Sequence, residues 1–95
     1  MSPDGTVSVT RDAHEFVLHL DDERMGSLDY ALPEAGVMRI DYVEVAPELR
    51  GSGLGRELVR AAVDWAREGN LKIVPICGYA RAVITRDPLM RALLR

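Results

Sequence analysis

Three glycines occupy alternate positions in the stretch Arg50-Gly51-Ser52-Gly53-Leu54-Gly55. A long, uninterrupted, β-branched run over 37–45 precedes this stretch, and Pro47 ends the run because proline has no amide hydrogen for a strand ladder. After the glycines, apolar residues recur at helical spacing from Leu54 to Trp65, with charged residues on the opposite side. The sequence therefore predicts a strand, a glycine-rich loop and an amphipathic helix, in that order.

The remaining segments read as short strands and helices around this unit. Alternating apolar residues predict a hairpin over 16–20 and 25–30, and Pro33 and Gly36 are expected to break its second strand at 32–36. The other expected elements are an edge strand, a strand after the long helix, a second helix and a last helical turn, over 7–10, 71–77, 79–86 and 89–94. Because a strand–helix–strand crossover joins parallel strands, we expect a mixed α/β (α+β) fold: a mostly antiparallel sheet with one parallel strand–helix–strand unit.

Length and composition limit the class of protein. A chain of 95 residues is expected to form a single domain over 1–95. A net charge of −3 argues against nucleic acid as the main ligand, and one cysteine excludes an intrachain disulfide and fits a reducing cytoplasm. The N-terminus lacks a signal-peptide pattern, and no apolar run approaches the ~20 residues needed to span a bilayer. We therefore expect a cytoplasmic protein without a membrane, nucleic-acid or metal site, since His14 and His19 have no further ligand at suitable spacing.

The glycine loop at a helix start is a typical anion-binding arrangement. Glycine lets the backbone approach a ligand closely, and the first helical amides carry the positive end of the helix dipole. A diphosphate is the expected guest, and a tight turn without a ligand is the alternative. A Walker A loop needs Lys-Ser/Thr where Arg56-Glu57 follows Gly55, and a Rossmann fingerprint counted from Gly51 needs glycine where Arg56 stands.

The stretch from Val45 to Gly55 resembles the acetyl-CoA motif of GCN5-related N-acetyltransferases (GNATs), Arg/Gln-x-x-Gly-x-Gly/Ala after Val-x-Pro. The resemblance extends from about Phe16 to Pro88. It implies that acetyl-CoA is the cofactor, that loop amides hold its pyrophosphate, and that the backbone of the preceding strand pairs with the pantetheine arm where two strands splay apart. The cofactor-binding residues implied are Val43, Val45, Arg50, Gly51, Ser52, Gly53, Leu54, Gly55 and Arg56.

The chain departs from the larger members of that family in its length. Their N-terminal helix pair and C-terminal strands, which form much of the acceptor site, have no counterparts, so a truncated GNAT fold is expected. A second subunit could complete the acceptor side, and a homodimer is compatible with the exposed sheet edges. The ending Pro75-x-Cys77 resembles a compact subgroup of acetyltransferase-like proteins in which this cysteine is proposed to act in catalysis.

The usual catalytic acid of the family is missing. Ile84 stands where a typical member has the tyrosine that protonates the departing thiolate, so Cys77 or Tyr79 must substitute in an enzyme. Cys77 lies at a strand end before a helix, where the dipole favours a thiolate that could take the acetyl group directly. The alternatives are an inert thiol that fills space and a tyrosine that packs with its hydroxyl in water.

Two acids on the central strand, Asp41 and Glu44, are candidates for the general base. Strict alternation predicts that Asp41 shares a face with Val43 and Val45, and that Glu44 shares the other face with Ile40. A solvated carboxylate is the alternative for each. Likewise, the helix arginines at 56, 60 and 67 could reach the 3′-phosphate of CoA or form an ordinary solvated face.

The sequence thus predicts an acetyl-CoA-dependent N-acyltransferase whose acceptor is an unidentified primary amine of a small molecule or peptide. A non-catalytic module that binds acyl-CoA and acts with a protein partner is the alternative from another class. A third interpretation is a structural domain in which the glycine turn binds nothing.

Overall fold

The computed structural model describes residues 6–95. In chain order the elements are β1 (Val7–Arg11), β2 (Glu15–Leu20), β3 (Glu23–Glu34), β4 (Val37–Val45), the 3₁₀ turn η2 (Pro47–Leu49), α1 (Leu54–Glu68), β5 (Lys72–Pro75), α2 (Gly78–Arg86) and α3 (Pro88–Arg91). The strands form one sheet in the order β1-β2-β3-β4-β5, with antiparallel neighbours except for the parallel pair β4 and β5. The mixed α/β fold predicted from the sequence is confirmed.

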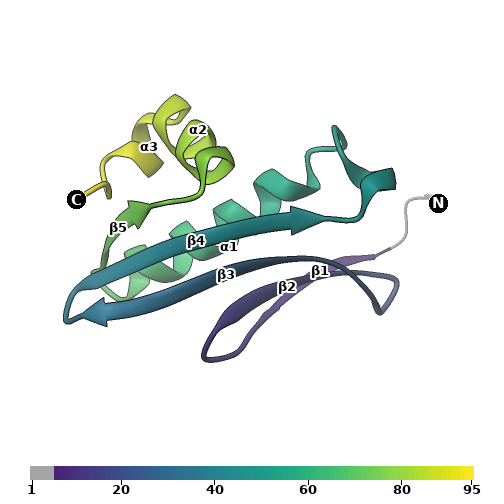
Figure 1. Ribbon diagram of the computed structural model, residues 1–95, viewed down its shortest axis with the longest axis horizontal. Coiled ribbons are helices and arrows are strands. Elements are labelled where there is room, and N and C mark those ends of the chain that lie inside the picture. Colours follow the sequence, from purple (N-terminus) through teal and green to yellow (C-terminus); the bar gives the residue numbers. More distant parts are fainter. Residues whose placement is uncertain (1–5) are drawn as a thin grey trace.

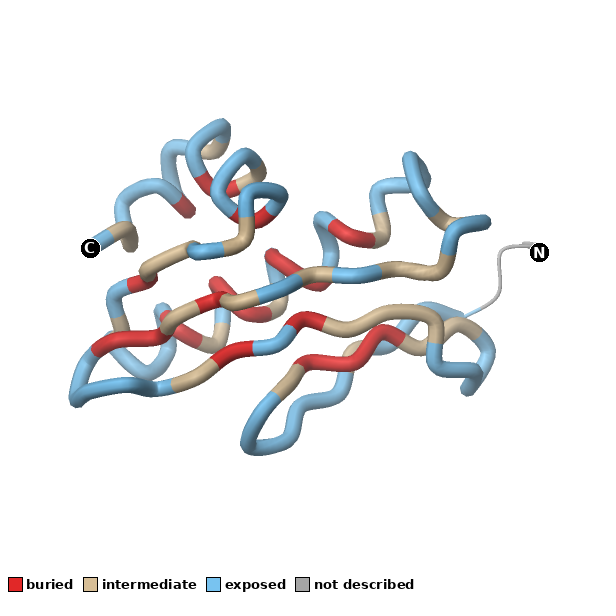
Figure 2. The backbone as a smooth tube through the Cα atoms, viewed as in Figure 1, coloured by how far each residue is buried: buried red, intermediate tan, exposed pale blue. Residues whose placement is uncertain are grey.

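A single helix covers one face of the sheet. α1 runs behind the strands, while α2 and α3 lie beside the β5 edge (Figure 1). The buried residues gather where α1 meets the inner face of the sheet (Figure 2), and the largest fully buried side chains are Leu18, Leu28, Met38, Ile40, Leu58, Val59, Val63, Ile73 and Ile84. Each such side chain stabilises the fold by about 1.5–3 kcal/mol, so this layer fixes the position of α1 and its N-terminal loop. Within residues 6–95, every helix is too short or too polar to cross a bilayer.

The expected break in the second hairpin strand is wrong. β3 continues through Pro33 to Glu34, which pairs with Val37, and the turn is confined to Ala35 and Gly36. The ladder is irregular between Ala31 and Glu34, and such an irregularity tolerates a proline because no amide hydrogen is required there. The two strands therefore form a long ribbon that carries β4 to the glycine loop.

The predicted face of Asp41 is also wrong. Asp29 pairs with Tyr42 but Tyr30 pairs with Ile40, so Asp41 is an extra residue in β4 and forms a β-bulge. The extra residue reverses the alternation, so Ile40 is on the same inner face as Val43. Asp41 instead lies on the outer face, away from α1, and bonds with Arg39 there.

The pairing of β4 with β5 stops at Ile40 and Pro75. The amides of Ile76 and Cys77 both point back to the carbonyl oxygen of Ile40, at 2.9 and 3.2 Å, and the chain then turns into α2. Residues 42–45 consequently pair with β3 alone. The two parallel strands separate at this point, as the family resemblance implies.

Gly26 allows β3 to approach the site-bearing end of β4. A Cβ at this position would lie 2.8 Å from the carbonyl oxygen of Glu44 and 2.9 Å from a methyl group of Val45. We expect Gly26→Ala to lower the free energy of unfolding by about 1–3 kcal/mol, because backbone atoms must shift to admit the methyl group. The melting temperature should fall by roughly 4–8 °C per kcal/mol in a chain of this size.

Gly78→Ala is the matched control for that substitution, because a Cβ there meets nothing within 4 Å. Alanine is also the better helix former, so this control should melt at or above the temperature of the parent protein. Equal melting temperatures for the Gly26 and Gly78 variants would contradict the close approach at Gly26.

Candidate functional site

A groove of about 680 Å³ opens beside the C-terminal end of β4, on the side where β4 no longer pairs with β5. β4 forms one wall, and the loop and first turn of α1 form another. Its lining residues are Val43, Val45, Leu49, Arg50, Gly51, Ser52, Gly53, Gly55, Arg56 and Tyr79. The structure therefore brings together every predicted cofactor-binding residue except Leu54, which packs against the core instead.

Two glycines of the loop adopt a conformation that other residues rarely take. Gly51 has a φ of 84° and Gly53 a φ of 92°, and Gly53 is the N-cap of α1. A side-chain-bearing residue at such a φ costs about 1–2 kcal/mol. These two turns bring the chain out of η2 and into the helix within four residues, and both glycines line the groove with backbone alone.

The loop amides divide into bonded and unbonded groups. The Ser52 amide donates to the carbonyl oxygen of Leu49 (3.0 Å), and the Leu54 amide lies 3.2 Å from the hydroxyl oxygen of Ser52. Four amides have no hydrogen-bond partner within residues 6–95: those of Gly51, Gly53, Gly55 and Arg56. Unbonded amides at the positive end of a 15-residue helix form an anion site, and the guanidinium groups on either side of the loop add positive charge.

The backbone of β4 offers a second set of free polar groups. The Ala46 amide donates to Met25 on β3 (2.8 Å), and residues of an antiparallel ladder alternate between pairs that bond with the neighbour and pairs that do not. By this alternation, Val43 and Val45 direct their N–H and C=O groups away from β3. β5 has already separated there, so these groups are available to an extended ligand.

Tyr79 lies across the groove at the start of α2. A Cβ built on Gly55 would be 2.9 Å from the Tyr79 hydroxyl and 3.3 Å from the carbon that bears it. The side chain is 46% exposed, and its hydroxyl makes no hydrogen bond within the described chain. Gly55 is therefore the residue that admits the ring, which places a phenol donor over the first turn of α1.

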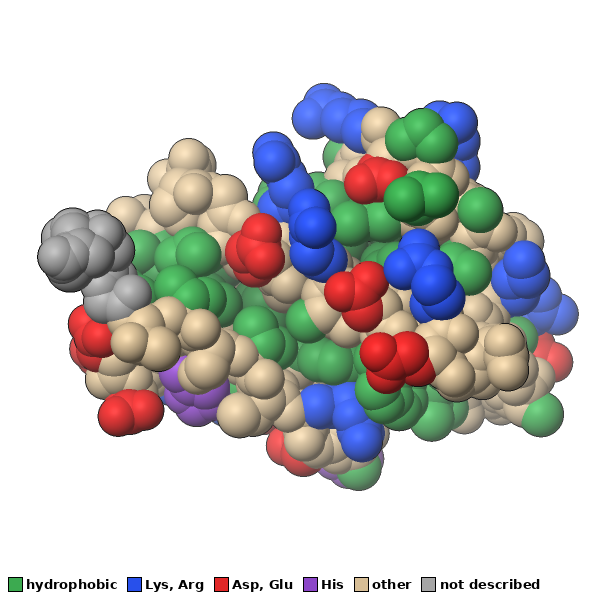
Figure 3. All heavy atoms as spheres, turned by 180° about the vertical axis from the view of Figure 1, so that it is seen from behind, with side chains coloured by type: hydrophobic (Ala, Val, Ile, Leu, Met, Phe, Trp, Pro, Cys, Tyr) green, Lys and Arg blue, Asp and Glu red, His purple; other side chains and the backbone are tan. Residues whose placement is uncertain are grey.

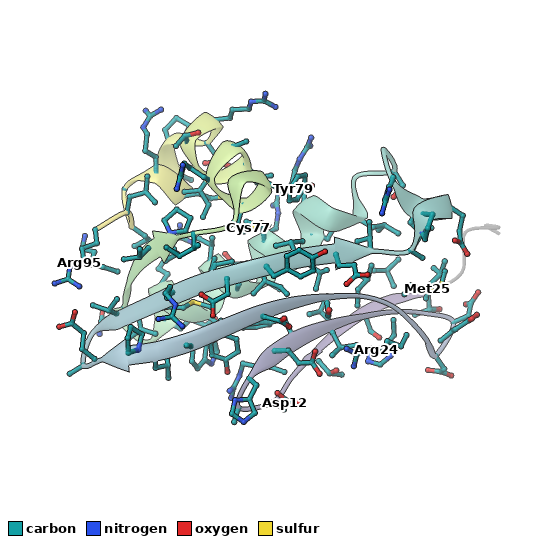
Figure 4. The ribbon with its side chains drawn as sticks, viewed as in Figure 1. Asp12, Arg24, Met25, Cys77, Tyr79 and Arg95 are labelled. Atoms are coloured by element: carbon teal, nitrogen blue, oxygen red, sulfur yellow. The ribbon has the colours of Figure 1, made fainter. Side chains whose placement is uncertain are left out.

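Cys77 is the N-cap residue of α2, at the end of β5 where the two parallel strands separate (Figure 4). Its side chain is half-buried and packs against the core, and it does not line the groove. Ile84 lies further along α2, is fully buried, and has no side-chain proton to donate. Tyr79 is thus the one candidate acid whose polar group is in the groove.

The two candidate bases lie on the outer face of β4, with Tyr42 between them in the strand. Asp41 forms a two-pronged ion pair with Arg39, at 2.6 and 3.2 Å, whereas Glu44 is exposed and makes no salt bridge within residues 6–95. Neither carboxylate lines the groove. Of the two candidate bases, Glu44 is therefore the one without an ion-pair partner within residues 6–95.

Sequence reasoning missed Asp29 on this face and Leu49 in the groove. Asp29 faces Tyr42 across the β3–β4 ladder. Burial raises the pKa of its carboxyl above the usual 3.8, and the neighbouring carboxylates of Glu15, Asp41 and Glu44 raise it further, against a smaller opposing effect of Arg24. Only strand pairing reveals this neighbourhood, but Leu49 could have been found, since it directly precedes the glycine loop.

A strand end with free backbone groups beside a glycine-rich helix start is the geometry of a protein that binds a ligand with a phosphorylated end and an extended arm. A sequence profile described as GCN5-related N-acetyl-transferase matches residues 15–93. The chain belongs to this family. Membership implies acyl transfer from acetyl-CoA, and the fold is the one that its members use to bind that cofactor.

Solved structures agree with this assignment. A GCN5-like protein from Staphylococcus aureus is 25% identical, with a TM-score of 0.76 over 100% of this chain and 91% of its own. The ribosomal-protein-alanine N-acetyltransferase of Brucella melitensis is 22% identical (TM-score 0.65), with 79% of this chain and 62% of its own covered. An aminoglycoside acetyltransferase from an uncultured soil sample is 18% identical (TM-score 0.61), with 76% and 54% covered.

These last two likenesses concern the fold. This chain spans less than two thirds of either enzyme, so both have further chain outside the shared part. No sequence match was found among curated proteins.

The contact between Gly55 and Tyr79 can be tested by a double-mutant cycle. We expect Gly55→Ala to leave the melting temperature nearly unchanged, because the exposed ring can swing outward and alanine favours the helix. Acetyl-CoA affinity, measured by calorimetry, should fall roughly tenfold, about 1.4 kcal/mol. In a Tyr79→Ala background the same substitution should have little further effect. An equal loss in both backgrounds would mean that the methyl group blocks the ligand directly.

The raised pKa of Asp29 predicts a pH-dependent effect on stability. A carboxyl whose pKa is higher in the folded state than in the unfolded state destabilises the fold when it is charged. This destabilisation disappears when the pH falls below the pKa of the unfolded state, near 3.8. Asp29→Asn should therefore raise the melting temperature at pH 7 and make no difference at pH 3. Salt should remove the part due to neighbouring carboxylates and leave the part due to burial. An unchanged or lower melting temperature at pH 7 would contradict this electrostatic picture.

Proposed function

We propose that this protein is an acetyl-CoA-dependent N-acyltransferase that moves an acetyl group to a primary amine of a small molecule or an exposed peptide. The observation that carries the proposal is the continuous groove formed by the free backbone edge of β4 and the four unbonded amides at the start of α1. One end is suited to a diphosphate and the other to an amide-containing arm. The cofactor supplies the activated acetyl group as a thioester.

The chain's own residues bind and orient in this proposal. The amides of Gly51, Gly53, Gly55 and Arg56 receive the pyrophosphate, while those of Ser52 and Leu54 hold the loop in shape through its internal hydrogen bonds. Val43 and Val45 pair with the pantetheine arm as an added strand would. This orientation directs the thioester toward the point where β4 and β5 separate.

Proton transfer is assigned to the candidate base and acids of the chain. Glu44 takes a proton from the attacking amine, because Asp41 is held in its ion pair with Arg39. In direct transfer the proposed proton donor to the departing thiolate is Tyr79, whose hydroxyl must turn from its position against Gly55 toward the thioester. In the covalent route, the Cys77 thiolate forms a bond to the carbonyl carbon as the CoA sulfur leaves, and the amine then displaces Cys77 from the acyl-enzyme.

A specific observation favours the alternative of a non-catalytic acyl-CoA-binding module. Ile84 is fully buried at the usual tyrosine position, and Cys77 packs against the core rather than lining the groove. Such a module would still bind acetyl-CoA and would act through a partner protein. A cytoplasmic location, a single domain and a homodimer remain predictions for either function.

The test is calorimetric titration with acetyl-CoA, followed by intact mass and by an amine-acetylation assay with a panel of amines. We expect micromolar binding and acetylated amine products. Glu44→Gln should keep the affinity and lose transfer roughly 10²-fold, the scale of general base catalysis, while Asp41→Asn serves as the matched control. An acetyl adduct that is absent in Cys77→Ala would assign the covalent route.

Each other outcome has a definite meaning. Binding without transfer to any amine, even with the parent protein, would favour the binding module over the enzyme. No binding at millimolar acetyl-CoA would overturn the proposal, because both functions require the groove to hold the cofactor.

A further inference from the structure

The two edges of the sheet differ in how they are protected. At the β5 edge, residues 93–95 add a short parallel stretch. The Ile73 amide donates to the carbonyl oxygen of Leu93 (2.8 Å), and the Arg95 amide donates to that of Ile73 (3.0 Å). Arg95 also forms an ion pair with Glu34 at 2.6 Å, which fastens this stretch to the end of β3. At the other edge, β1 pairs with β2 alone among the described strands, so β1 is the free edge of the sheet.

The backbone of β1 carries a row of free polar groups. Just beyond the strand, the Asp12 amide donates to the carbonyl oxygen of Glu15 (2.9 Å), so the even-numbered residues of this ladder bond with β2. Because bonded and non-bonded pairs alternate in an antiparallel ladder, Val7, Val9 and Arg11 direct their N–H and C=O groups away from β2. These main-chain groups make no hydrogen bond within residues 6–95.

β1 lacks the features that usually protect an edge strand, such as a proline, a bulge or a charge that points inward from the edge. It reads Val-Ser-Val-Thr-Arg and pairs with β2 without a register shift. Its one charged side chain, Arg11, is held away from the edge: the guanidinium lies 4.5 Å from the ring centre of Trp65 and 3.1 Å from the Tyr30 hydroxyl. An unprotected edge rich in β-branched residues is a template for another strand.

The inner side of β1 adds apolar surface to these free groups. The helix α1 packs on β2, β3, β4 and β5, and leaves Val9 half-buried and Val7 43% exposed. Seen from behind, apolar surface lies at the end of the molecule where β1 begins (Figure 3). A strand placed beside β1 covers both valines on this side, and on the other side it meets Ser8 and Thr10, which are exposed. The edge therefore offers hydrogen bonds and apolar contact together.

We propose that β1 pairs with β1 of a second copy of this chain, antiparallel and centred on Val9, so that two five-stranded sheets join into one. In such a two-fold pair Val9 opposes itself and Val7 opposes Arg11, so all three outward-facing residues meet outward-facing partners. A centre at Ser8 or Thr10 places one of the three beyond the end of the partner strand. The centre at Val9 also opposes each arginine to a valine rather than to the other arginine. The occupant is a second copy because the strand is complementary to itself in hydrogen bonding, apolar side chains and charge.

This association goes beyond the proposed function and does not depend on it. Three strands separate β1 from β5 in the sheet, so the seam between copies lies away from the gap beside β4. The groove of each copy stays open in the pair. We therefore expect acetyl-CoA binding to be the same in the monomer and in the dimer.

The test is sedimentation velocity on the full chain from micromolar to millimolar protein, where we expect a reversible dimer. Across the seam, Ser8 of each copy opposes Thr10 of the other on the exposed side. The double variant Ser8→Lys/Thr10→Lys opposes like charges there and should raise the dissociation constant of the dimer roughly tenfold or more, with a smaller effect at high salt.

The matched control is Ser8→Lys/Thr10→Glu, which changes the same two positions but opposes unlike charges across the seam. It should dimerise at least as tightly as the parent protein. The bond between the Thr10 hydroxyl and His19 (3.1 Å) is lost in both variants, so it does not distinguish them. Melting temperatures establish that both variants are folded.

Each result supports or overturns this inference. A parent protein that stays monomeric at millimolar concentration would overturn it, and so would equal dimerisation of the two variants, because the contact would then lie elsewhere. Loss of the dimer in both variants would overturn the register, since a centre at Ser8 or Thr10 opposes like charges in each of them. A parent protein that dimerises as expected but binds no acetyl-CoA would refute the proposed function and leave this inference in place.

Discussion

The separation of β4 from β5 is the feature on which the rest of the site depends. The ladder between the two strands ends at Ile40 and Pro75. The missing amide hydrogen of Pro75 is not the cause, because Lys72 and Ile76 direct their amides to β4 and residue 75 therefore faces away from it. At the same level β4 carries an extra residue, Asp41, which breaks its regular pairing with β3. The carbonyl oxygen of Ile40 accepts both following amides of the β5 chain, and this closes the ladder on the inner side of the gap. Free backbone groups on β4 follow from that closure.

The loop before α1 makes the two ends of the groove chemically different, because it adds free amides at one end only. Gly51 and Gly53 take positive φ values, and the hydroxyl of Ser52 satisfies the first helical amide. The loop is therefore held by its own hydrogen bonds, while alternate amides remain free for an anion. Binding of an anion to such preformed groups would carry a small ordering cost. Tyr79 then joins the helix start to α2, since its ring fits only because residue 55 is glycine.

Much of this arrangement could be predicted from the sequence, because its signals are local. The β-branched run that ends at Pro47, the alternate glycines and the helical spacing after Leu54 each concern neighbouring residues. The β-bulge at Asp41 could not be predicted in this way, since it is a mismatch between two strands and depends on the register of β3. For the same reason the raised pKa of Asp29 could not be predicted: burial, its main cause, and the added effect of carboxylates from β2 and β4 both depend on strand pairing. The continuation of β3 past Pro33 could not be predicted either, because only the register with β4 shows that this proline lies at a ladder irregularity.

Other features that could not be predicted from the sequence involve residues that meet only through tertiary packing. Arg60 and Arg86 are on separate helices, and they line one groove because α1 and α2 pack together at the β5 edge. The outer face of the sheet, opposite α1, carries charge of the other sign. The outer face of β4 carries carboxylates and is covered by no helix within residues 6–95, so charge of opposite sign lies on the two sides of the gap. In the proposed function, the arginines Arg50 and Arg56 line the groove that takes the anionic cofactor, and Asp41 and Glu44 lie on the face open to an amine. This division of charge could guide both ligands to one gap without a deep pocket, because electrostatic attraction acts beyond contact distance.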